Sequence, residues 1–71
     1  MSFATELTAA LLHADAAYRA DLDTAFTNLE SALNTEWVTD AGNSATDATF
    51  IQIQSDIIDM AENVASQFTD Q

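Results

Sequence analysis

The chain has no cysteine, no proline, no lysine, a single glycine and a single arginine among its 71 amino acids. Without cysteine it can form neither a disulfide framework nor a thiolate metal site. Without proline, and with Gly42 as the only glycine, little in the local sequence interrupts a helix. A chain this short buries a limited interior, so its stability must come from apolar side chains, from assembly with another chain, or from both.

Long hydrophobic runs are also absent. No apolar stretch reaches the roughly 18 residues that indicate a transmembrane helix. The N-terminal segment has no basic flank, and Glu6, His13 and Asp15 interrupt its apolar part, which differs from a secretory signal peptide. We therefore expect a soluble protein, in the cytoplasm or in a virion, that does not bind a membrane.

Charge of one sign is almost missing. Twelve acidic residues stand against one arginine, Arg19, and the net charge is −11. Protein affinity for DNA and RNA comes largely from Lys and Arg, so we expect no direct nucleic-acid binding. The hydrophobic content of 48% argues against disorder. The acidity is compatible with solubility, with salt adaptation and with mimicry of nucleic acid, and the sequence leaves these three open.

Large apolar residues recur at helical spacing from Phe3 to Trp37. The stripe repeats about every 3.8 residues, above the 3.5 of a heptad, so a left-handed coiled-coil seam is not expected. The pattern predicts one long helix over residues 3–38, with Ser2 as its N-cap.

A second helix is predicted over residues 46–68, where apolar residues again follow a spacing of three and four. Between the two helices, Gly42 can adopt the left-handed conformation that ends a helix, and Ser44, Thr46 or Asp47 can cap the next one. The sequence thus predicts an all-α fold: a single domain, 1–71, built as a two-helix antiparallel hairpin.

Two helices that touch along one line leave much of their apolar surface uncovered. We therefore expect the hairpin to be completed by oligomerisation or by a larger protein assembly. The residues expected at this interface are Leu7, Leu11, Tyr18, Leu22, Phe26, Leu29, Leu33, Trp37, Ile53, Ile57 and Phe68.

Catalytic and metal-binding patterns are scarce. His13 is the only histidine, and on a continuous helix it cannot face Asp15, which lies two residues away. We expect no catalytic residue, no metal site and no cofactor, and hence no enzyme. Arg19 has Asp15 and Asp23 four residues before and after it, which predicts local ion pairs, with an ion pair between subunits as the alternative.

The polar side of the second helix carries an acidic face, which consists of Asp56, Asp59, Glu62 and Asp70. The first functional hypothesis is a non-enzymatic structural subunit of a virion, filament or secreted complex that packs through apolar helix faces. The alternative is an acidic inhibitor, of the anti-restriction or anti-CRISPR type, that imitates nucleic acid and occupies a basic DNA- or RNA-binding protein.

Trp37 near the turn of a short hairpin resembles the plan of the Trp-X-Gly family of small secreted proteins. Here the sequence reads Trp37-Val38-Thr39, so the glycine of that motif is missing. The length of the hairpin is also similar to that of type III secretion needle subunits, whose turn contains a proline that this chain lacks. Both resemblances concern plan and length, and no functional residue is carried over from either family.

Overall fold

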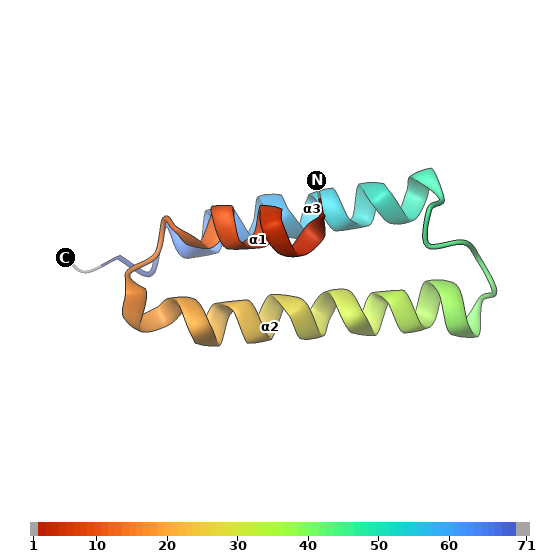
Figure 1. Cartoon of the computed structure of the whole chain (residues 1–71), viewed down its shortest axis with the longest axis horizontal. Coiled ribbons are helices and arrows are strands. Elements are labelled where there is room, and N and C mark those ends of the chain that lie inside the picture. Colours follow the sequence, from red (N-terminus) through yellow and green to blue (C-terminus); the bar gives the residue numbers. More distant parts are fainter. Residues whose placement is uncertain (1, 70–71) are drawn as a thin grey trace.

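The structure, a computed structural model, describes residues 2–69, and their regular structure is entirely helical. Helix α1 (Phe3–Leu11) is followed by α2 (Ala16–Asn34), which continues as a short π-helix, η1 (Thr35–Asp40), and then by α3 (Ala48–Ala65). Figure 1 shows that α1 and α3 lie side by side and run in the same direction, with α2 antiparallel to both. The predicted all-α class is confirmed.

The prediction of a two-helix hairpin is wrong, because the segment 3–38 is not one helix. α1 ends at Leu11, and the N–H groups of Leu12, His13 and Ala14 donate to carbonyls three residues earlier. Asp15 then adopts an extended conformation (φ −63°, ψ 149°), and its N–H donates to the carbonyl of Phe68 over 3.0 Å. The group that satisfies this helix break therefore comes from the opposite end of the chain.

Arg19 holds the same break from the other side. Its Nε donates to the carbonyl of Ala14 at 2.8 Å, and its Nη2 donates to the carbonyl of Leu12 at 3.3 Å. A guanidinium that forks to two carbonyls satisfies acceptors that a helix end leaves unpaired, and its positive charge favours the C-terminal end of the helix dipole. Among the described residues, Arg19 makes no ion pair with Asp15 or Asp23, so that prediction is wrong.

The other helix boundaries follow the local sequence more closely. The Ser2 hydroxyl accepts from the Thr5 N–H at 3.3 Å, which confirms the predicted cap. Of the three residues expected as possible caps of the second helix, Asp47 is its N-cap, and its Oδ1 accepts from the Thr49 N–H at 2.9 Å. Gly42 takes the left-handed conformation, with φ +76°, as predicted. The second helix is shorter than the predicted 46–68, because a tight turn follows Ala65.

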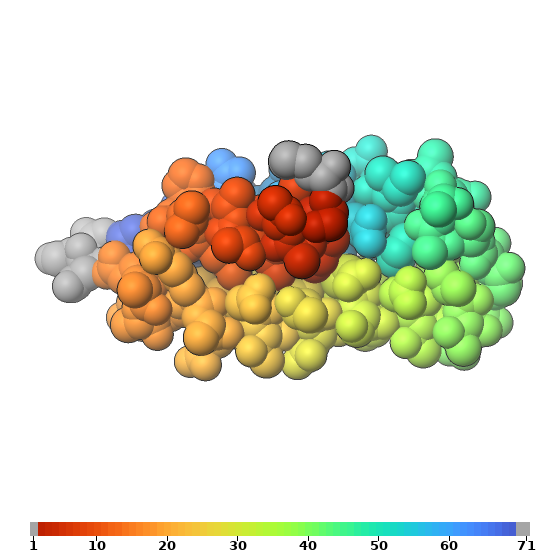
Figure 2. All heavy atoms as spheres, in the orientation of Figure 1, coloured from red at the N-terminus to blue at the C-terminus, as the bar shows by residue number. Residues whose placement is uncertain are grey.

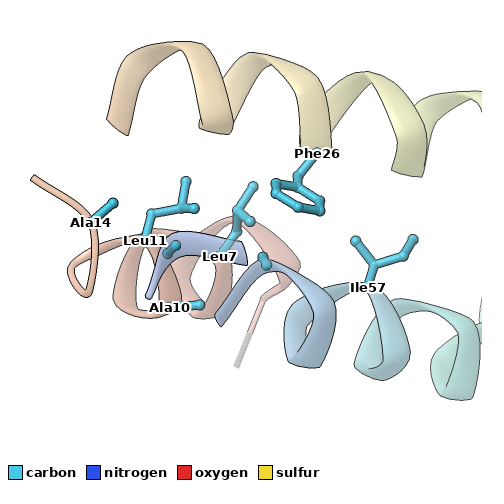
Figure 3. Packing of buried hydrophobic residues seen from close by; sticks show 8 residues of the cluster. Leu7, Ala10, Leu11, Ala14, Phe26 and Ile57 are labelled. Carbon is cyan, nitrogen blue, oxygen red and sulfur yellow. The ribbon is translucent and has the colours of Figure 1, made fainter. Parts of the chain in front are cut away.

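The core lies where α1 meets α2 and α3. In Figure 3, Leu7 and Leu11 of α1 and Ile57 of α3 point toward α2, and Phe26 points back from α2 toward them. On α3, alanines that are 0% exposed let α1 approach closely. The buried cluster contains Leu7, Ala10, Leu11, Ala14, Phe26, Ile57, Ala61 and Ala65.

Folding α1 back changes how much interior a single chain can enclose. The exposed surface is 4627 Å², against roughly 4,300 Å² expected for a folded monomer of 7.6 kDa. The chain accordingly buries about 58% of an extended-chain surface of roughly 11,000 Å², close to the value usual at this size. The expectation that two helices leave much of their apolar surface uncovered does not apply, because α1 packs on α2 and α3 as a third helix.

We predict that Arg19→Ala lowers the free energy of unfolding by about 1–2 kcal/mol, because two charge-assisted hydrogen bonds at the helix break are lost. Arg19→Lys should recover little, since an ammonium cannot fork to both carbonyls in the same way. Urea denaturation followed by circular dichroism measures the difference. If Asp23→Asn costs as much as Arg19→Ala, an ion pair rather than carbonyl capping is responsible.

Candidate functional site

The residues predicted to form an interface separate into two groups. Four of them, Leu7, Leu11, Phe26 and Ile57, are at most 7% exposed and belong to the chain's own core. Three others are half-buried against that core: Leu22, Leu33 and Ile53. The remaining ones reach the surface, since Tyr18, Phe68 and Leu29 are 43%, 40% and 37% exposed, while Trp37 is half-buried at the corner between α2 and α3.

α1 covers only one side of the pair formed by α2 and α3. Figure 2 shows α1, coloured red to orange, lying over this pair. Against α2 it borders Arg19, Ala20 and Asp23, and against α3 it borders Ile58 and Glu62. α1 therefore covers the flank of α2 that carries Ala20 and Asp23 and the flank of α3 that carries Ile58 and Glu62.

The opposite flanks carry large apolar residues. A helix turns by about 100° per residue, so Tyr18, Leu22 and Leu29 lie on the side of Phe26 away from Arg19 and Asp23. By the same count, one set of α3 residues lies on the side of Ile57 away from Ile58 and Glu62. This set consists of Ile53, Met60 and Val64.

Because α2 and α3 are antiparallel, these flanks share one surface, which we call the open face. The ring of Phe68 joins it, lying 5.3 Å from the ring of Tyr18 between centroids. The described residues include six large apolar side chains that are well exposed, and four of them belong to the open face: Tyr18, Leu29, Met60 and Phe68. The full set comprises Tyr18, Leu22, Ala25, Leu29, Ile53, Met60, Val64 and Phe68.

Met60 is the open-face residue that sequence reasoning placed least well. The apolar stripe of the second helix leaves Met60 and Ala61 as equal candidates for the inward position. The structure puts Ala61 inward, at 0% exposed, and Met60 outward, at 49% exposed. The signal that distinguishes them is size, because only a small residue fits beneath α1.

The acidic residues of α3 point to solvent. Asp56, Asp59 and Glu62 are all exposed, while Asp70 lies outside the described residues. Gln52 Nε2 donates to Asp56 Oδ1 at 2.9 Å, and His13 Nε2 lies 3.7 Å from Glu62 Oε1. His13 therefore faces α3 from the turn after α1, with its side chain 55% exposed.

Trp37 closes the connection between α2 and α3. Its Nε1 donates to the carbonyl of Ser44 at 3.2 Å, and its own carbonyl accepts from the Asn43 N–H at 3.1 Å. The indole thus anchors the corner from within the chain. A role for Trp37 at an interface stays a prediction.

Residues 2–69 hold neither a cluster of metal ligands nor a helix able to span a membrane. No three of their His, Asp or Glu side chains are placed to hold a metal ion together. None of their helices combines the length and hydropathy that crossing a membrane requires.

Comparison of the chain with protein-family models, with curated proteins and with solved structures finds no match in any of the three. The resemblances in plan to the Trp-X-Gly family and to needle subunits gain no support from them.

We expect Trp37→Phe to loosen the corner without unfolding the bundle. The ring is kept, but the N–H donor to the Ser44 carbonyl is lost, at a cost of about 1 kcal/mol or less for an exposed bond. Hydrogen exchange should accelerate in the segment 41–47 and stay unchanged in α1. Unchanged exchange in that segment would show that the indole does not hold the connection.

Proposed function

We propose that the chain is a non-enzymatic structural subunit that assembles with other protein chains through an apolar helix face. The observation that carries this proposal is the open face, where four large apolar side chains are 37% to 49% exposed on one side of a 71-residue chain. Contiguous apolar surface of this kind is typical of protein interaction sites. Scattered single apolar residues would need no such explanation.

The arrangement of the interior supports the same proposal. The core is already filled by the face of α1 that packs on α2 and α3, and the buried side-chain nitrogen and oxygen atoms of the described residues are all hydrogen-bonded. The four exposed side chains of the open face, those of Tyr18, Leu29, Met60 and Phe68, are therefore not needed to complete this interior. Their exposure costs solubility, and a partner that covers them removes that cost.

The proposal is tested by molar mass. We expect the chain, co-expressed with the products of its neighbouring genes, to elute as a stable complex of fixed stoichiometry, or as an oligomer of its own, in chromatography with light scattering. A monomer in every such pairing, and alone up to millimolar concentration, would contradict a subunit role. Measurements at low and high salt separate assembly from general charge attraction.

A second function, the inhibitor that imitates nucleic acid, is favoured by one observation. Asp56, Asp59 and Glu62 follow one another at spacings of three residues on the solvent side of α3, which puts neighbouring β-carbons about 5–6 Å apart. Such a row of carboxylates is comparable to phosphates along a strand. A basic nucleic-acid-binding enzyme would be its target.

For this second function we expect the chain to inhibit DNA cleavage by a restriction enzyme or a CRISPR nuclease. The neutralised variant Asp56→Asn, Asp59→Asn, Glu62→Gln should lose that inhibition. The control variant Asp21→Asn, Asp23→Asn, Asp40→Asn removes the same charge elsewhere and should keep it. Equal inhibition by both variants, or none by the native chain, would rule out the row on α3 as a mimic.

A further inference from the structure

The open face is long enough to bind one helix of about three turns. From Tyr18 to Leu29 it extends along α2 for about 17 Å at 1.5 Å per residue, which matches three turns of a partner helix. On the opposite side of α2 and α3, the nine-residue helix α1 already packs against the same two helices. The helix pair thus accepts a helix on one side and presents a comparable apolar surface on the other.

The margins of the open face are acidic. By the same count of about 100° per residue, Asp21 lies next to Ala25 at the outer edge of α2. Asp56 lies next to Met60 at the outer edge of α3. Both carboxylates are exposed. A partner helix seated between these margins would bring its own flanking residues toward them, where Lys and Arg are attracted and Asp and Glu are repelled.

Among residues 2–69, no positively charged side chain lies at these margins. Arg19, the only Lys or Arg in the sequence, lies on the flank of α2 that faces α1 and donates to backbone carbonyls there. His13 also lies on the α1 side, facing Glu62. A second copy would place acidic margins against acidic margins, and each chain carries a net charge of −11.

We infer that the open face binds an amphipathic helix of another protein that carries Lys or Arg beside its apolar stripe. Three observations support this: the apolar side chains of the open face, its acidic margins, and the hydrogen bonds that hold Arg19 on the other flank of α2. This is the helix-in-groove mode of recognition, in which apolar anchors three and four residues apart fill the groove and charges at the rim select the partner. The inference rests on the proposed subunit function and names the surface and the chemistry of the partner.

The probe is a synthetic 18-residue helical peptide with Leu at positions spaced three and four apart and Lys on both margins of that stripe. A peptide with Glu in place of Lys and a shuffled peptide of the same composition serve as controls. We expect binding of the Lys peptide by fluorescence anisotropy, at least about tenfold tighter than either control, and weakened at high salt. Amide shift changes should map to the open face.

The variant Leu29→Gln, Met60→Gln should weaken binding of the Lys peptide by about tenfold or more, because two apolar anchors are removed. Both side chains are exposed, so we expect the helix content in circular dichroism to be unchanged. The control Leu12→Gln, Ile51→Gln replaces two apolar residues that are still more exposed, at 60% and 54%, and that lie off the open face, so it should bind as the native chain does.

Several results would overturn the inference. Equal binding of the shuffled peptide would reduce the effect to general charge attraction, and equal binding of the Glu peptide would remove the selection by charge. Self-association of the native chain that Leu29→Gln, Met60→Gln abolishes would identify a second copy as the occupant. If a stable complex with a partner protein survives in that variant, the subunit function stands and the open face is not its docking surface.

Discussion

The turn at residues 12–15 is the constraint on which the rest of the structure depends. If the chain continued as a helix there, Leu7 and Leu11 would extend beyond the bundle instead of packing on Phe26 and Ile57. The turn is stabilised by two sets of hydrogen bonds. The Asp15 N–H donates to the carbonyl of Phe68 near the other end of the chain, whereas the Arg19 guanidinium donates to carbonyls five and seven residues before it. It also decides which flank of α2 and α3 is covered, and therefore which flank stays open.

The helices could be predicted from the sequence, but the break between the first two could not. Apolar spacing indicated helix over almost all of the residues that are helical, and Ser2, Gly42 and Asp47 marked boundaries through their own local chemistry. The segment from Leu12 to Asp15 contains no Gly or Pro. Its backbone is satisfied by Arg19 and by Phe68, and no local pattern indicates that a residue at the far end of the chain will supply the acceptor.

The open face could be predicted only in part from the sequence. Tyr18, Leu29 and Phe68 were expected at an interface and are exposed, whereas Leu7, Leu11, Phe26 and Ile57 were expected there and are buried within the chain. A helical stripe gives the direction of an apolar side chain but not the identity of what covers it. For these residues the placement of α1 distinguishes core from surface, and that placement follows from the turn.

The two sides of the α2–α3 pair differ in the size of their side chains, and this difference limits what can bind to the open face. On the α1 side, Ala61 and Ala65 are 0% exposed beneath the neighbouring helix, so the helix axes can approach closely. On the open face, Leu29 and Met60 project outward and keep any incoming helix farther away. Met60 has an unbranched, flexible side chain that adapts to different shapes. The open face therefore favours a partner with long basic side chains at the edges of its apolar stripe, since Lys and Arg can reach Asp21 and Asp56 across the wider gap.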